Sequence, residues 1–188
     1  MFPISLPNLW LKTDCLSNSI AADAQDWITT ESSLTIRVKE LGIAFSLEVL
    51  NQSQVPLSSS QQKTLCTKDT SALVREVLLK QANIPVIYAQ TIMPISTVTG
   101  TEKMLAELGD QPLGQVLFQS PQATRGEIEF SEVTENSDLG QYIKTVLKQE
   151  SQTKTYIRRS QFQLNHKPLL VCECFLPALF TTKKINET

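Results

Sequence analysis

The sequence predicts an α+β fold built on one antiparallel β-sheet, and three observations support this prediction. Two pairs of Val-, Ile- and Leu-rich segments, 73–79 with 85–93 and 156–164 with 169–176, are separated by short connections that suit hairpins. Helical patterns stand between the strands at irregular intervals, which favours an antiparallel sheet over parallel βαβ units. The chain has 188 residues, 41% of them hydrophobic, so we expect a single domain over residues 1–188 with a buried core.

In the N-terminal part of the chain we expect two short helices and a strand. Segment 23–31 places Trp27 and Ile28 on one side of a helix, and a second helix follows the N-cap Ser32-Ser33 and ends at Gly42. Residues 43–50 alternate with the period of a half-buried strand. The next segment, 51–62, is polar and aperiodic, so we expect a flexible loop there.

In the C-terminal part the pattern predicts further helices around one more strand. Segment 101–108 reads as a helix that Gly109 ends, and Pro112 opens another helical turn that reaches Phe118. Ile128 and Phe130 indicate a strand. Apolar residues between 139 and 147 fall on one face of a helix, and the polar stretch 149–153 follows it.

Charge and hydropathy exclude several classes of protein. The formal net charge is -2, from 17 Lys and Arg against 19 Asp and Glu, which argues against binding to nucleic acid or to acidic membranes. No apolar run approaches the roughly 20 residues that a membrane helix needs. The first seven residues contain two prolines and no basic residue, so we expect no signal peptide, no integral membrane segment and a cytoplasmic protein.

The cysteines and the histidine offer little to a metal or a nucleophilic site. The chain has four cysteines and one histidine, His166, and none of them shows the spacing of a zinc site. Cys172 and Cys174 share one face of an apolar strand, which predicts small buried core residues. His166 lies in a predicted turn and is expected on the surface. Phosphate-binding glycine motifs are also absent, so we expect neither a metal site nor a nucleotide-binding site.

One charged residue interrupts an apolar strand near the C-terminus. Glu173 stands in the middle of segment 169–176, which otherwise reads as buried on both faces. An ionised and unpaired carboxylate in such a place costs several kcal/mol, so it must be paired, neutralised or directed into a polar cavity. Glu173 is therefore either the structural partner of an arginine or a carboxylate in a functional pocket.

A second charged pair interrupts the strand 73–79. Arg75 and Glu76 point to opposite faces of that strand, and we expect one of them to be directed at the interior. A guanidinium on an apolar wall can bind a carboxylate with two parallel hydrogen bonds. The periodicity leaves two possibilities open, a direct Arg75–Glu173 salt bridge and a small-anion pocket between the two residues.

Five sequence blocks extend this picture beyond single residues. In order along the chain, they are Val74-Arg75-Glu76-Val77-Leu78-Leu79, Thr91-Ile92-Met93-Pro94-Ile95-Ser96-Thr97, residues 108–118 (LGDQPLGQVLF), Arg158-Arg159-Ser160 and residues 168–177 (PLLVCECFLP). Further matching residues lie at 26–27 and 33–35. Each block is weak alone, but together, from about residue 26 to 178, they strongly resemble the chorismate pyruvate-lyase family.

The resemblance implies a fold, a reaction and a set of site residues. It implies a single antiparallel sheet with helices over one face and a ligand pocket buried under flap-like helices. It implies that a monomer converts chorismate to 4-hydroxybenzoate and pyruvate, towards ubiquinone, without a metal or a cofactor. Carried over by position, Arg75 binds the ring carboxylate and Glu173 meets the ring hydroxyl, as the two catalytic candidates. Backbone groups at Leu34 and Leu113 complete the substrate-binding site.

Two departures from the family pattern and one alternative function accompany this expectation. Gln90 stands where relatives commonly have an arginine, which raises the question of how the second carboxylate of chorismate is held. Segment 131–155 is longer than in compact members, and we expect it to be a surface or partner-binding addition. The alternative is a non-catalytic domain that binds or senses an aromatic acid, although the chain shows no helix-turn-helix segment with a basic face.

Overall fold

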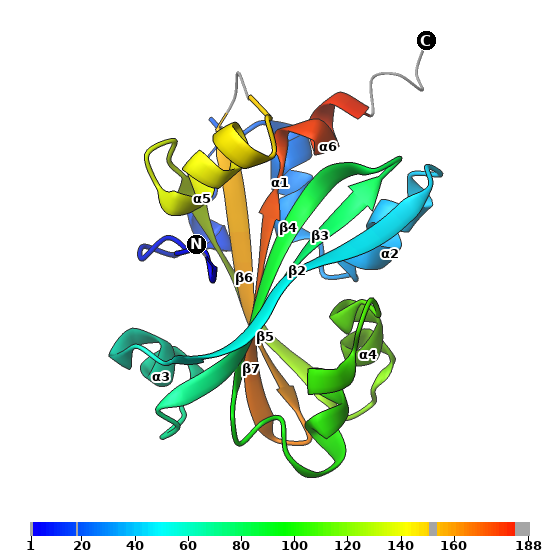
Figure 1. The fold of residues 1–188 in the computed structure, drawn as a ribbon. Helices are drawn as coiled ribbons and strands as arrows, with labels where there is room; N and C mark the ends of the chain where they lie inside the picture. The colour runs from blue at the N-terminus through cyan, green and yellow to red at the C-terminus, as the bar shows by residue number, and fades with distance from the viewer. Residues whose placement is uncertain (1, 18, 151–153, 183–188) are drawn as a thin grey trace.

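The computed structural model describes residues 2–17, 19–150 and 154–182, and its centre is a strongly twisted antiparallel sheet (Figure 1). The order of its seven strands is β1-β5-β6-β7-β4-β3-β2, and every neighbouring pair is antiparallel. This confirms the predicted α+β fold. The strands are β1 (Leu11–Lys12), β2 (Phe45–Pro56), β3 (Ser71–Gln81), β4 (Ile84–Pro94), β5 (Ala123–Val133), β6 (Thr155–Leu164) and β7 (Lys167–Phe175).

Short helices cover the sheet. They are η1 (Thr13–Cys15), α1 (Ala22–Thr29), α2 (Leu34–Glu40), α3 (Ser59–Leu65), η2 (Gly100–Glu107), α4 (Leu113–Gln119), α5 (Asp138–Gln141), η3 (Tyr142–Val146) and α6 (Pro177–Thr182). In Figure 1, α2 and α4 lie to the right of the sheet, and α3 and α5 lie to its left. Within the described residues, no helix combines the length and the apolar character needed to cross a membrane.

The two predicted hairpins are confirmed, and their turns explain why they form. β3 and β4 are joined by Ala82 and Asn83, which both have positive φ, at 45° and 68°. β6 and β7 are joined by Asn165 and His166, with φ of 51° and 63°. Two consecutive residues of positive φ match the right-handed twist of the flanking strands, and asparagine tolerates this conformation better than most residues. His166 is exposed in its turn, as expected.

The flexible loop expected at 51–62 is wrong, because this segment is ordered by its partners. β2 continues to Pro56 and pairs with β3 along the edge of the sheet, where one face meets solvent and tolerates polar side chains. α3 then begins after Ser58, whose side chain accepts a hydrogen bond from the Gln61 backbone N–H, while the Gln61 side chain accepts one from the Ser58 backbone N–H. This reciprocal capping box starts the helix in a sequence of low hydrophobicity.

The core lies on both faces of the sheet and includes part of segment 131–155. On one face, side chains of α1, α2, η2 and α4 pack against the strands. On the other face, Leu139, Tyr142 and Ile143 from the predicted helix at 139–147 pack against β3, β4, β6 and β7. The expectation of a surface addition is therefore wrong for this part of the segment, since three of its side chains are buried. Residues 151–153 of the predicted polar stretch lie outside the described residues.

Candidate active site

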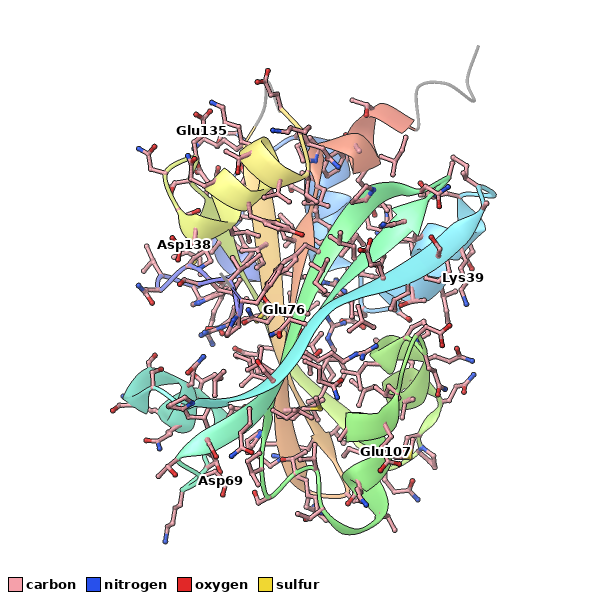
Figure 2. All side chains as sticks on the ribbon, in the orientation of Figure 1. Lys39, Asp69, Glu76, Glu107, Glu135 and Asp138 are labelled. Atoms are coloured by element: carbon pink, nitrogen blue, oxygen red, sulfur yellow. The ribbon has the colours of Figure 1, made fainter. Side chains whose placement is uncertain are left out.

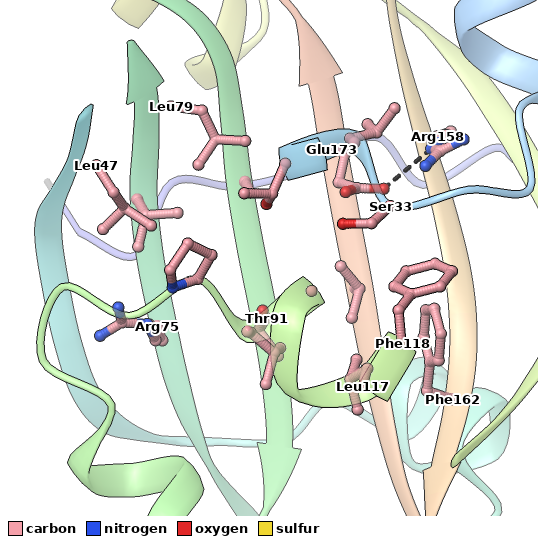
Figure 3. Close-up of a pocket in the computed structure, with 18 of the residues that line it drawn as sticks. Ser33, Leu47, Arg75, Leu79, Thr91, Leu117, Phe118, Arg158, Phe162 and Glu173 are labelled. Carbon is pink, nitrogen blue, oxygen red and sulfur yellow. Dashed lines mark hydrogen bonds and ion pairs between the residues drawn. The ribbon is translucent and has the colours of Figure 1, made fainter. Parts of the chain in front are cut away.

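A cavity opens on the sheet face that α2 and α4 cover (Figure 3). About 610 Å³ of space in and around it is free of protein atoms, and part of that space is open solvent. The cavity itself has a volume of about 50 Å³, so the space is narrow. Its walls are mainly apolar, from residues such as Leu47, Val77, Leu79, Leu117 and Phe162, and its charged residues are Arg75, Arg125, Arg158 and Glu173.

All four site residues named from the sequence line this one cavity. Arg75 enters it from β3 and Glu173 from β7. Leu34 and Leu113 are the first residues of α2 and α4, the two helices that cover the cavity. The first N–H groups of a helix have no partner within it. The structure thus brings together residues that are far apart in the chain, while their roles toward a ligand stay predictions.

The guanidinium of Arg75 has no acidic partner among the described residues. Arg75 is 3% exposed, and it donates hydrogen bonds to Oε1 of Gln52 (3.2 Å) and to the carbonyl oxygen of Gly109 (2.6 Å). Burial lowers the pKa of Arg75, and the charge of nearby Asp110 partly opposes that shift. Neutral partners hold the side chain in place, and its positive charge remains available to an anion in the cavity.

Glu173 is paired with Arg158, a partner that the strand patterns did not predict. Arg158 faces Glu173 directly in the β6–β7 register, and its Nε donates to Oε2 of Glu173 at 2.9 Å. The same guanidinium donates to the carbonyl oxygens of Trp27, Ile28 and Thr30, at 3.3, 3.3 and 2.6 Å. Arg75 and Glu173 form no ion pair in the described part of the chain, which removes the direct salt bridge as a possibility.

Arg125 is a further positively charged residue of the cavity. The alternation of apolar and polar residues in the sequence did not predict its place there. The β5–β6 register shifts between Arg125 and Ile128, so an irregularity in β5 breaks the period-two pattern there. Nε of Arg125 donates to Oγ of Ser160 at 3.0 Å, and Nη1 donates to the carbonyl oxygens of Glu31 (3.1 Å) and Thr30 (3.5 Å). Burial and the charge of Arg158 lower the pKa of Arg125 to about 10.

Ser33 contributes an unpartnered hydroxyl to the same cavity. Its side chain is buried, and its Oγ has no hydrogen-bond partner among the described residues. Ser33 is the N-cap of α2, yet its side chain does not cap that helix. Figure 3 shows it at the side of the cavity where Glu173 and Arg158 lie. A buried hydroxyl without a partner is costly, and a polar ligand group in the cavity would satisfy it.

The opposite face of the sheet holds Glu76 and Gln90, which do not line this cavity. Figure 2 places Glu76 near the middle of the molecule, and it is fully buried. It accepts hydrogen bonds from the Ile4 backbone N–H (2.7 Å), the Tyr88 hydroxyl (2.6 Å) and the Gln90 amide (3.3 Å). Burial, followed by the charge of Glu76, raises the pKa of Tyr88. Both Arg75 and Glu76 are therefore buried, on opposite faces, where only one had been expected to face the interior.

The cysteines do not contribute to the cavity. Cys172 and Cys174 are buried among apolar side chains of the opposite face, which confirms their interpretation as core residues. Burial raises the pKa of Cys172 to about 12, so its thiol stays protonated at neutral pH. Among the described residues, no group of three or more His, Cys, Asp and Glu side chains is arranged to hold a metal ion.

Comparison with known proteins gives the cavity a family context. The family model described as chorismate lyase matches residues 6–185. A protein named probable chorismate pyruvate-lyase from Pseudoalteromonas translucida is 40% identical over 179 residues, which cover 95% of this chain and 97% of that protein. A protein of the same name from Psychromonas ingrahamii is 36% identical over 176 residues, 94% of each chain.

Two solved structures with a similar fold have low sequence identity to this chain. The effector domain of PhnF from Mycobacterium smegmatis is 11% identical, with a TM-score of 0.54 over 78% of this chain and 90% of that one. The C-terminal domain of a histidine utilization repressor from Pseudomonas syringae pv. tomato is 10% identical, with a TM-score of 0.52 over 71% and 92%. At these identities the likeness shows the fold alone.

Proposed function

This chain belongs to the chorismate lyase family, and we propose on that basis that it converts chorismate to 4-hydroxybenzoate and pyruvate. The observation that carries the proposal is the placement of Arg75 and Glu173 in one narrow, mainly apolar cavity. Arg75 has only neutral hydrogen-bond partners among the described residues, and Glu173 stands on a strand two positions away in the sheet. Such a cavity suits a flat ring with an anionic group at one end and a hydroxyl at the other.

The proposed reaction is an elimination that makes the ring aromatic. The hydrogen on C4 of chorismate leaves as a proton, and the electron pair of that C–H bond forms the third double bond of the ring. The bond between C3 and the ether oxygen breaks at the same time, and its electron pair leaves with the oxygen as enolpyruvate. Enolpyruvate then takes a proton on its methylene carbon and becomes pyruvate. The atoms and electrons balance without an oxidant, a reductant or a covalent enzyme intermediate.

Three side chains and two backbone positions have defined parts in this proposal. Arg75 binds the ring carboxylate through two charge-assisted hydrogen bonds. Glu173 accepts a hydrogen bond from the ring hydroxyl at C4, the carbon that loses its proton, and orients that end of the ring. Arg158 holds the Glu173 carboxylate at 2.9 Å, so that its direction is set before substrate arrives. Backbone groups at Leu34 and Leu113 close the pocket around the ligand.

The apolar walls support the chemistry that the polar groups perform. Side chains such as Leu47, Val77 and Leu79 exclude water from much of the cavity surface. With less water, the contacts of Arg75 and Glu173 with a ligand are stronger than they would be at an exposed surface. The proposal includes release of 4-hydroxybenzoate towards ubiquinone synthesis by a single domain that covers residues 1–188. A monomeric state and a cytoplasmic location stay predictions from the sequence.

Two assays test the proposal against the non-catalytic alternative. Purified protein is mixed with an excess of chorismate, and 4-hydroxybenzoate and pyruvate are measured separately over time. We expect both products in equal amounts and in many-fold excess over the protein. Tight binding of 4-hydroxybenzoate without any turnover of chorismate would instead identify a sensing domain. The shared fold with regulator effector domains does not favour that alternative, because the likeness shows the fold alone.

A further inference from the structure

We propose that Arg125 binds the second carboxylate of the substrate, which lies on the enolpyruvyl side chain that leaves as pyruvate. This inference rests on the proposed function and specifies how the cavity recognises the leaving group. Gln90, where relatives commonly have an arginine, does not reach this cavity. Its side chain lies on the opposite face of the sheet, where its amide donates hydrogen bonds to Glu76 and to the Ile4 carbonyl oxygen. The second anionic group therefore needs a cation from another position.

The charge of the cavity supports a ligand with two negative charges. Its charged lining residues are three arginines and one glutamate, and the glutamate is already paired with Arg158. Arg75 and Arg125 are left without an acidic hydrogen-bond partner among the described residues. Chorismate carries two carboxylates, so a complex with both arginines engaged is electrically balanced.

The order of strands places the three polar groups as the substrate needs them. Across the sheet, Arg75 is on β3, Glu173 on β7 and Arg125 on β5, with β4 and β6 in between. Neighbouring strands are about 4.8 Å apart, so the strand of Glu173 lies roughly 10 Å from each of the other two before the arginines reach inward. In chorismate the hydroxyl at C4 is at the opposite end of the ring from the carboxylate at C1, and the enolpyruvyl side chain is on C3, next to the hydroxyl. A ring bound by Arg75 and Glu173 therefore carries its side chain near the Glu173 end, and Arg125 enters the same cavity from β5, two strands from Glu173 on the side away from Arg75.

The surroundings of Arg125 hold its guanidinium ready for an anion. The bonds from its Nε to Ser160 and from its Nη1 to two backbone carbonyl oxygens fix the plane of the group. Its Nη2 has no hydrogen-bond partner within the described residues. The guanidinium also lies 5.4 Å from the centre of the Phe162 ring, which lines the cavity. Arg125 is thus positioned by neutral groups, in the same way as Arg75.

Matched ligands test this inference without any need for turnover. 3-(Carboxymethoxy)-4-hydroxybenzoate carries a second carboxylate near the position of the enolpyruvyl group, and 3-methoxy-4-hydroxybenzoate lacks it. We expect the unchanged protein to bind the dicarboxylate more tightly than it binds the monocarboxylate. In Arg125→Gln, affinity for the dicarboxylate should fall about 10- to 100-fold, while affinity for the monocarboxylate stays the same. Arg75→Gln should weaken both ligands.

Controls separate this inference from loss of folding, from general charge effects and from the proposed function. Lys63→Gln removes one positive charge from exposed α3 and should change neither affinity. If Arg125→Gln does not fold, Arg125→Lys keeps the charge with fewer donors and should show a smaller loss for the dicarboxylate only. Equal losses for both ligands, or no loss, would overturn the inference. Normal chorismate turnover by the unchanged protein, with an unaltered KM in Arg125→Gln, would refute the role of Arg125 and leave the lyase activity intact.

Discussion

Arg75 and Glu173 line one cavity from two strands that β4 separates, and the described structure shows no ion pair between them. Each is held instead by its own partners, Arg75 by Gln52 and Gly109 and Glu173 by Arg158. Both side chains therefore line the cavity without pairing with each other, and a ligand that contacts both would bridge them.

Removal of the Arg75 guanidinium should weaken ligand binding. Arg75→Ala loses a charge-assisted contact to the ring carboxylate, so we expect affinity for 4-hydroxybenzoate to fall by about 1.5–3 kcal/mol. Isothermal titration calorimetry measures this directly. Lys63→Gln is the control, because it removes an exposed positive charge outside the cavity. An Arg75→Ala variant that binds 4-hydroxybenzoate as the unchanged protein does would contradict the assigned role.

Glu173→Gln should impair turnover more than folding. The amide keeps the shape of the side chain and its oxygen still accepts a hydrogen bond from Arg158, but the negative charge at the ring hydroxyl is lost. We expect kcat to fall about 100-fold or more, with a smaller change in the free energy of unfolding. The matched control is Glu129→Gln, whose ion pair with Arg159 lies outside the cavity lining. Parent-like turnover by Glu173→Gln would show that the role is wrongly assigned.

Arg158 should be important for stability as well as for the site. Arg158→Gln leaves the Glu173 carboxylate without its partner and removes the bonds to three carbonyl oxygens around α1. We expect the free energy of unfolding to fall by about 3–5 kcal/mol. Its neighbour Arg159 pairs with Glu129 at 2.7 Å in a more exposed setting, so Arg159→Gln should cost about 1 kcal/mol. Urea unfolding compares the two, and equal losses would argue against a special place for Arg158.

Glu102 should make stability depend on pH in the acidic range. Hydrogen bonds from Lys167, Thr101 and Asn165 lower the pKa of Glu102 from 4.5 to about 2. Because the folded pKa is the lower one, this contribution is fully present above about pH 4.5 and is lost as the pH falls towards 2. Urea midpoints of the unchanged protein and of Glu102→Gln should therefore differ most at neutral pH and converge near pH 2. A difference that is constant with pH would refute this origin.

The same urea measurements on a Glu107→Gln variant control for the loss of any carboxylate from this segment. Glu107 pairs with Lys103 at 3.7 Å on an exposed surface. Exposed pairs contribute little, so Glu107→Gln should change the urea midpoint only slightly across the same pH range. The contrast between the two variants isolates the effect of the hydrogen bonds that Glu102 accepts.

Several features of the fold follow from local patterns and were predictable. Segments rich in Val, Ile and Leu with short connections identified the strands of both hairpins, and Asn83 and Asn165 suit the positive φ of their turns. The edge strand β2 was missed beyond residue 50 because its polar side chains face solvent, and pairing with β3 orders it. In the same way, the register shift in β5 concealed Arg125, since a period of two no longer applies across it.

Local patterns were sufficient to show that Arg75 and Glu173 carry charge into apolar strands, because burial and alternation are properties of short segments. The partners of these charges emerge only from the folded chain. The strand order β5-β6-β7-β4-β3 sets Arg158 against Glu173, keeps Arg75 two strands away and brings Arg125 to the same cavity. Pairing between strands that are far apart in the sequence decides which charged residues become neighbours, and no short segment of the chain contains that information.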